Sequence, residues 1–141
     1  GLTYANGINV SVDGSLLYAA SLLDNTIHVY DRDPESNALS FRTSIEVGSA
    51  VDNIEVDPED NLYIACHPQL LTFVKHSKDE SLLSPSQVFK ITMEDYGSYV
   101  VDEIYLNEGE ELSGSSVGAM YNDILLIGAV YDDHILRCRM E

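Results

Sequence analysis

Hydrophobic and polar positions alternate along this chain in short stretches that are typical of β-strands. The segments INVSV, IHVYD, IEVDP and NLYIA alternate or run apolar over four to six residues, with turn residues such as Asp-Gly, Asp-Pro and Asn-Asp between them. No apolar pattern with the helical period of about 3.6 residues continues over three turns. The sequence therefore predicts an all-β chain, with local turns over residues 31–37 and 75–86.

A repeated pattern groups these strands into units. The segments NVSVDGSLLYAAS, residues 9–21, and NIEVDPEDNLYIACH, residues 53–67, share an Asn, alternating apolar positions, Val-Asp, a turn and then Leu-Tyr. Equivalent residues such as Asp13 and Asp57 lie 44 positions apart. A weaker third copy covers residues 116–131. A repeat of this length is typical of a modular β-architecture.

Repeats of roughly 40 to 50 residues with several strands each are typical of β-propeller blades. We expect a partial β-propeller of about three four-stranded blades, over residues 1–44, 45–92 and 93–141. Closed propellers usually have roughly 4 to 8 blades. We therefore expect the C-terminal half of a six-bladed ring, or a half-ring that pairs with a second copy of the chain.

The net charge of the chain narrows the range of partners. There are 24 acidic and 7 basic residues, which gives a formal charge of −17. Such a charge argues against nucleic acid or an anionic membrane as a partner and favours cation binding. No apolar run reaches the roughly 20 residues of a membrane-spanning helix, so we expect no transmembrane segment.

Short acidic and amide side chains stand at the beginning of two repeats. Asn6 lies in TYANGIN, and Asp52 and Asn53 lie in SAVDNIEVD. Corresponding strands of neighbouring blades begin near a common axis, so we expect the oxygens of these three residues to converge on one Ca²⁺ ion. Calcium prefers oxygen ligands such as carboxylates and amide carbonyls. The alternative is that they are only turn or bulge residues, and that His67 is a buried core histidine.

Two further patterns have structural explanations. Residues 114–118, GSSVG, match the G-x-S-x-G nucleophile elbow, which requires a strand, a sharp turn and a helix. A strand pattern and an Asn-Asp turn follow here, so we expect a strand of small residues near the propeller axis. His28, His76 and His134 have no neighbours with ligand-like spacing, and we expect them to be solvated.

Several of these segments occur in an order that is known from one family. ANGIN, IHVYD, VDNIEVDP, CHP, GSSV and LLIG, followed by a terminal strand that contains a Cys, resemble the C-terminal half of the paraoxonase/arylesterase family. The resemblance covers nearly all 141 residues. The chain is also similar to the gluconolactonase-like calcium propellers, but CHP and the terminal Cys favour the paraoxonase branch.

The resemblance implies a six-bladed propeller that hydrolyses lactones and aryl esters with the help of calcium. It places Asn6, Asp52 and Asn53 among the ligands of the catalytic calcium ion, and it gives His67 a catalytic role. Residues at or near the wall of the implied substrate pocket are Tyr4, Phe73, Val130 and Tyr131.

The resemblance also implies a secreted protein in which Cys138 is disulfide-linked to an N-terminal region and Cys66 is free. The spacing of the two cysteines by itself fits no zinc motif and leaves the cellular compartment open. The family's other calcium ligands and its histidine dyad belong to earlier blades, so we expect this chain alone to be inactive. The alternative function is a non-catalytic propeller fragment that acts as a binding or assembly module.

Overall fold

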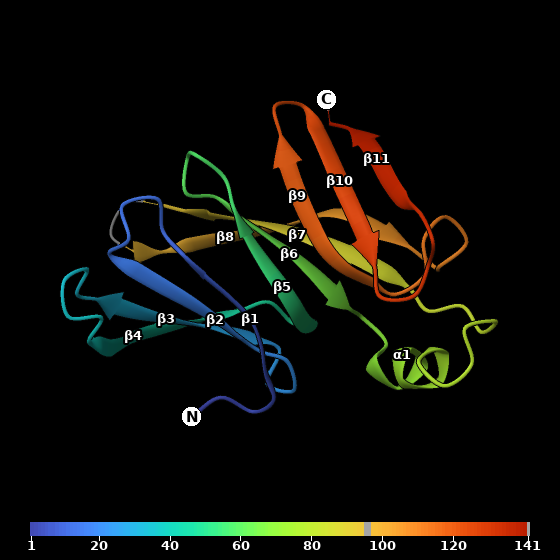
Figure 1. The fold of residues 1–141 in the computed structure, drawn as a ribbon, viewed down its shortest axis with the longest axis horizontal. Coiled ribbons are helices and arrows are strands. Elements are labelled where there is room, and N and C mark those ends of the chain that lie inside the picture. The colour runs from blue at the N-terminus through green and yellow to red at the C-terminus, as the bar shows by residue number, and fades with distance from the viewer. Residues whose placement is uncertain (95–96, 141) are drawn as a thin grey trace.

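The computed structural model describes residues 1–94 and 97–140 and contains three antiparallel sheets (Figure 1). The first sheet consists of β1 (Ala5–Val10), β2 (Leu16–Ser21), β3 (Thr26–Arg32) and β4 (Leu39–Glu46). The second consists of β5 (Ala50–Val56), β6 (Leu62–His67), β7 (Ser86–Met93) and β8 (Tyr99–Asn107). The third consists of β9 (Ser115–Tyr121), β10 (Ile124–Ala129) and β11 (Ile135–Arg139).

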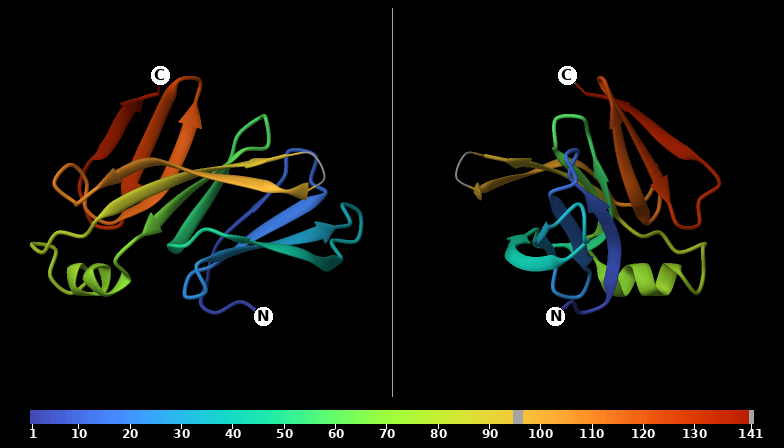
Figure 2. Two further views of the ribbon diagram at one scale, coloured as in Figure 1. Left: turned by 180° about the vertical axis from the view of Figure 1, so that it is seen from behind. Right: turned by 60° about the vertical axis from the view of Figure 1, so that its left-hand side comes forward.

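In each sheet the strands follow one another in sequence order, as in a propeller blade. The first strands of the sheets are neighbours, because β1 packs against β5 and β5 packs against β9. All three begin at the same edge of the molecule, as the views in Figures 1 and 2 show. The predicted all-β, partial β-propeller fold is thus confirmed. The third sheet has three strands in the described part of the chain, one fewer than expected.

The sheets divide the chain at different residues from those expected. β8 pairs with β7 and completes the second blade, although the sequence placed it in the third. The reason is an insertion after β6 that contains the helix α1 (Leu70–His76) and lengthens the second repeat. The helix has only 7 residues, about two turns, and is too short for a helical period to stand out in the sequence.

The alternation of apolar residues produces two cores between the blades. The larger core joins the first two blades, and the smaller joins the second and third. Each large apolar side chain that is fully buried contributes about 1.5–3 kcal/mol. The central members of the larger core are Tyr18, Ile27, Val29, Ile64 and Ile91, and those of the smaller are Tyr63, Val88, Leu112, Leu125 and Ile127. The apolar positions of the strands therefore serve mainly to pack neighbouring blades against each other.

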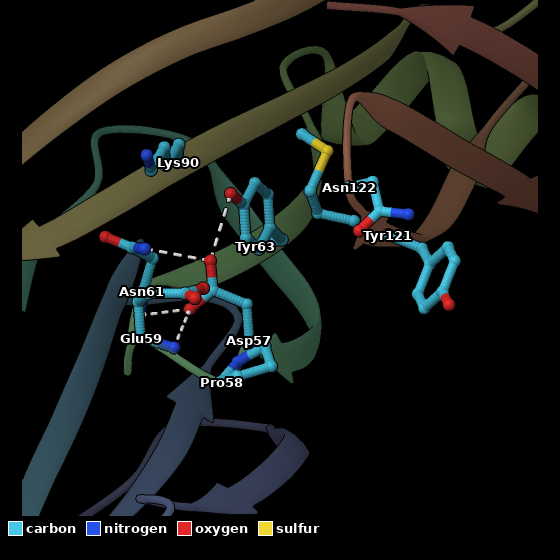
Figure 3. A pocket seen from close by; sticks show the side chains of 9 residues that line it. Asp57, Pro58, Glu59, Asn61, Tyr63, Lys90, Tyr121 and Asn122 are labelled. Atoms are coloured by element: carbon cyan, nitrogen blue, oxygen red, sulfur yellow. Dashed lines mark hydrogen bonds between the residues drawn. The ribbon is translucent and has the colours of Figure 1, made fainter.

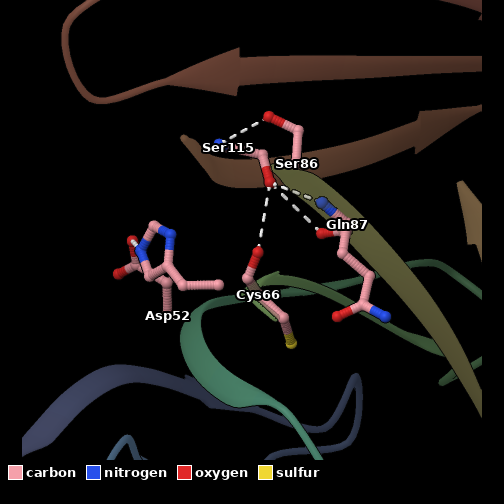
Figure 4. A network of polar contacts seen from close by, with 6 residues as sticks. Asp52, Cys66, Ser86, Gln87 and Ser115 are labelled. Carbon is pink, nitrogen blue, oxygen red and sulfur yellow. Dashed lines mark hydrogen bonds and ion pairs between the residues drawn. The ribbon is translucent and has the colours of Figure 1, made fainter. Parts of the chain in front are cut away.

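Polar side chains also connect neighbouring blades. The Asn9 amide donates a hydrogen bond to the Ile54 carbonyl at 2.9 Å. The Ser115 hydroxyl lies 3.4 Å from the Cys66 carbonyl oxygen and accepts a bond from the Gln87 backbone (Figure 4). Ser115 is the first residue of strand β9, so GSSVG enters a strand with no helix after it. The nucleophile-elbow interpretation is excluded by this local structure.

No described residue belongs to a helix that is both long and apolar enough to cross a bilayer.

Candidate functional site

Each of the three innermost strands is interrupted by a β-bulge close to its beginning. At that point one strand has one residue more than its partner, and the pairing register shifts. Bulges turn side chains out of the regular ladder and are common beside active sites. The bulged residues are Asn6 and Gly7 in β1, Asp52 and Asn53 in β5, and Ser116 in β9.

The bulges show which residues of the first two repeats are equivalent. Asn6 corresponds to Asp52. The spacing between these two residues is two positions longer than the spacing between the turn aspartates Asp13 and Asp57. The difference arises because two residues separate the end of β1 from Asp13, whereas Asp57 directly follows β5. The two predicted groups of oxygen ligands therefore occupy the same structural position in neighbouring blades.

The bulges of β1 and β5 touch each other. A Cβ atom added to Gly7 would lie 2.5 Å from the backbone oxygen of Asp52 and 2.7 Å from the Cα of Asn53, closer than any real contact. Only glycine permits this approach. Asn6, the neighbour of Gly7, is thereby held next to Asp52 and Asn53. Asn6 is exposed, Asn53 is half-buried and Asp52 is only 7% exposed.

His67, the last residue of β6, lies beside the buried carboxylate. Its Nε2 atom donates a hydrogen bond to Oδ2 of Asp52 over 3.2 Å, and the residue is 2% exposed. In the neutral ring this bond places the proton on Nε2 and leaves a lone pair on Nδ1. Within the described chain, Nδ1 is buried and has no hydrogen-bond partner. Nδ1 of His67 is thus a buried acceptor that no described residue uses.

A row of aromatic rings leads away from His67. The ring of Phe73, on α1, stacks on that of His67 with centroids 3.7 Å apart and planes at 19°. Phe73 contacts His76 at 6.3 Å, and His76 contacts Tyr131 at 5.4 Å in a T-shaped arrangement. The expectation that His76 is solvated was wrong, since it is 0% exposed. The sequence suggested a charged turn here, and the missed helix is what buries the ring.

An apolar pocket of about 250 Å³ lies between α1 and the first blade. Tyr4 and Phe73, both predicted wall residues, line it together. Val130 and Tyr131, the other two predicted wall residues, do not line this pocket, and both are partly exposed. Tyr131 is connected to Phe73 through the ring of His76. The other lining residues are Leu22, Leu23, Leu70 and Val74. The pocket adjoins the site because Phe73 both lines the pocket and stacks on His67.

A larger cavity of about 450 Å³ lies at the other end of β5, between the turns that follow β5 and β9 (Figure 3). Its polar centre is Asp57, which accepts hydrogen bonds from the backbone of Glu59 and Asn61, the Asn61 amide and the Tyr63 hydroxyl. Burial, and then the charge of Asp57, raise the pKa of Tyr63 to about 12. The oxygens of the Asp57 carboxylate are therefore already hydrogen-bonded to its own turn and to Tyr63.

The donor set beside Asp52 is suited to a hard cation. In residues 1–94 and 97–140, no three His, Cys, Asp or Glu side chains gather in a way that could hold a metal ion. A cation here would therefore depend on the Asp52 carboxylate, the amide oxygens of Asn6 and Asn53, and ligands from outside this chain. One carboxylate and two amides are typical oxygen ligands of calcium, and they are too few to complete its shell of about 6–8.

Comparison with known proteins extends these observations. The model of the arylesterase family matches residues 1–140. The chain belongs to the arylesterase family. It is 35% identical over 132 residues to human serum paraoxonase/arylesterase 1 and 33% identical over 132 residues to rat serum paraoxonase/arylesterase 2. It is 34% identical over 133 residues to bovine serum paraoxonase/arylesterase 2. Each comparison covers 93% of this chain and 36% of the relative.

The chain thus spans about a third of the length of these arylesterase relatives.

The two cysteines are both free, Cys66 buried and Cys138 partly exposed. Burial raises the pKa of both thiols. The disulfide of Cys138 stays a prediction, because its partner was expected outside this sequence. Sequence reasoning missed Gly7 and His76, although the Asn-Gly pair in ANGIN signalled an irregular backbone at the first of them.

Proposed function

We propose that the intact arylesterase-family protein hydrolyses aryl esters and lactones with calcium, and that this chain supplies part of the active site. The observation that supports the proposal is the junction of two bulged inner strands. It brings a buried carboxylate with a histidine partner next to two amides. The rest of the ring, and with it the remaining ligands, would come from outside residues 1–141.

In this proposal the side chains of Asn6, Asp52 and Asn53 bind Ca²⁺ through their oxygens. The ion that they would hold would supply polarisation of an ester carbonyl and compensation of the negative charge that develops on its oxygen. The chain's own geometry favours this use of Asp52. Its carboxylate is as deeply buried as Asp57 but accepts a single hydrogen bond among the described residues. A buried carboxylate with so few partners is costly unless a positive group accompanies it.

His67 would act on the attacking water. Asp52 fixes its tautomer by accepting the Nε2 hydrogen bond, so Nδ1 is free to accept a hydrogen bond from water and to orient it. Phe73 stacks on one face of the ring and excludes bulk water from that face. The apolar pocket that Phe73 shares with Tyr4 would take the hydrophobic part of the ester.

The cellular location is part of the same proposal. The similar proteins are named serum paraoxonases, and an extracellular protein is free to form disulfides. As the family resemblance implies, we propose that Cys138 forms a disulfide with a cysteine of the N-terminal region and that Cys66 remains a thiol. Peptide mapping of the secreted protein under non-reducing conditions tests this pairing. A bridge between Cys66 and Cys138 would refute it.

The decisive experiment measures hydrolysis of an aryl acetate and a lactone by the intact protein. We expect activity to fall to background in excess EGTA and to return with Ca²⁺ but not with Mg²⁺, which demands a tighter octahedral shell. The residue 1–141 chain alone should show no calcium-dependent turnover. Undiminished hydrolysis in EGTA would remove calcium from the proposal. Tight calcium binding without hydrolysis would favour the alternative, a binding or assembly module.

A further inference from the structure

The buried histidine of α1 has no place in the function proposed so far. His76 is fully buried, and its Nδ1 atom donates a 2.6 Å hydrogen bond to the carbonyl of Leu82. Its Nε2 atom is buried and has no partner within the described chain. A buried polar ring with one unsatisfied nitrogen is costly and requires an explanation. A phenylalanine would fill the same space without that cost.

The hydrogen bond to Leu82 determines which way the His76 ring faces. Leu82 lies six residues beyond the end of α1, so this bond ties the helix to the loop that returns to β7. The bond thus holds the ring among its aromatic neighbours, Phe73 at 6.3 Å and Tyr131 at 5.4 Å between ring centroids. A Cβ atom at Gly114 would lie 3.1 Å from Phe73 and 3.3 Å from His76, so the residue that precedes β9 leaves these rings little space.

Phe73 transmits this restraint to the site. Its ring is stacked on His67 at 3.7 Å, and His67 in turn holds Asp52. A shift of the Phe73 ring therefore changes the position from which His67 reaches the attacking water. Misplacement of a reacting group by about 1 Å can reduce a rate by about 100-fold.

We propose that His76 is a positioning residue of this site, whose hydrogen bond to the Leu82 carbonyl fixes Phe73 and, through it, the ring of His67. This inference builds on the proposed hydrolase function. It assigns no contact between His76 and the substrate. It also explains why a histidine stands where packing alone would accept a hydrocarbon ring.

Two substitutions separate the hydrogen bond from the ring. His76→Asn keeps an N–H donor near the position of Nδ1 and loses the ring, whereas His76→Phe keeps a ring and loses the donor. His28→Phe is the matched control, because His28 also belongs to an aromatic cluster, with Tyr30 and Phe41, on strands β3 and β4 of the first blade. All three are made in the intact protein, and their folding is followed by thermal denaturation.

The first measurement is steady-state hydrolysis of an aryl acetate. We expect His76→Phe to lower kcat at least about 10-fold with KM within about threefold, since orientation at the reacting atoms is lost while substrate binding is kept. His76→Asn should retain kcat within about threefold, and His28→Phe should match the wild type. Wild-type kcat and KM in a folded His76→Phe protein would overturn the proposal.

The second measurement does not depend on activity. Long-range ¹H–¹⁵N spectra of the imidazoles report the tautomer of His67. We expect a single Nε2–H form in the wild type, in His76→Asn and in His28→Phe, and averaging of the two tautomers in His76→Phe. If His76→Phe does not fold, His76→Asn decides, because a folded His76→Asn protein without the fixed tautomer contradicts the role of the donor. A wild type that hydrolyses no ester refutes the proposed function, whereas the spectra still test the positioning of His67.

Discussion

Two aspartates on β5 and its turn show how differently one strand can use the same side chain. Asp52 and Asp57 are similarly buried, 7% and 9% exposed, and stand at opposite ends of the strand. Asp57 accepts four hydrogen bonds from its own turn and from Tyr63. Asp52 accepts one, from His67, within the described chain. Burial alone therefore does not distinguish a structural carboxylate from a functional one, whereas the number of donors does.

The contrast has a physical basis. A carboxylate whose oxygens already accept several hydrogen bonds has few lone pairs left for another ligand. A carboxylate with one partner retains oxygen lone pairs that a cation can use. The bulge at Asp52 supports this difference, since it removes the residue from the regular ladder, whereas Asp57 sits in a tight turn whose N–H groups point at it.

The largest expected effect separates the two aspartates by activity. We expect Asp52→Asn to reduce calcium-dependent ester hydrolysis by at least about 100-fold, because it removes the negative charge that would bind the cation and orient His67. Asp57→Asn is the matched control and should change kcat less than about threefold. Both are measured as kcat/KM at saturating Ca²⁺. Equal losses in the two variants would abolish the distinction between them.

Stability should show the opposite order. We expect Asp57→Ala to lower the free energy of unfolding by about 2 kcal/mol, since it strands the backbone N–H groups of its turn and the Tyr63 hydroxyl. Asp52→Ala in EGTA should cost less, because it also relieves a poorly paired buried charge. Urea denaturation of the intact protein gives both values. A further comparison is Asp13→Ala, whose solvent-exposed turn in the first blade should lose less than the Asp57 turn.

The sequence predicted the elements of this comparison unevenly. The repeats of strand and turn residues were strong enough to predict three blades and the turn at Asp57. The candidate ligands Asn6, Asp52 and Asn53 were predicted from the corresponding places in two copies of this repeat. The structure places them on two bulges that touch. Whether they bind calcium remains a proposal.

The parts that sequence reasoning missed depend on contacts that no local pattern encodes. The helix α1 is too short to show a helical period in the sequence. Its last turn contains the basic residues Lys75 and His76, a composition that is typical of a solvent-exposed segment. Only packing against Phe73, Tyr131 and Gly114 reveals that His76 is buried. The boundary between the second and third blades was misplaced for the same reason, since the insertion around α1 breaks the spacing of the repeat.

The charge of Asp52 should also be detectable at Cys66, which pairs with the residue before it on β5. Burial raises the pKa of the Cys66 thiol, and the Asp52 carboxylate raises it further. The neutral thiol thus stabilises the fold below its ordinary pKa, and this stabilisation is lost as the pH rises above it. In metal-free protein, Asp52→Asn should move the pH dependence of Cys66 alkylation to lower pH, whereas Asp57→Asn should leave it unchanged. An unchanged profile in Asp52→Asn would contradict an effect of the Asp52 carboxylate on the Cys66 thiol.

The smallest expected effect concerns the weakest of the four bonds to Asp57, which the Tyr63 hydroxyl donates over 3.3 Å. Tyr63→Phe should lower the free energy of unfolding by about 0.5–1 kcal/mol at neutral pH. The pKa of Tyr63 is raised to about 12, so the neutral phenol stabilises the folded state below pH 10, and this contribution is lost between about pH 10 and 12. The variant lacks the titrating group and should lose less stability across that interval than the wild type. Parallel losses in the two proteins, measured by urea denaturation at each pH, would show that Tyr63 contributes nothing to the alkaline transition and that Asp57 is satisfied by its own turn alone.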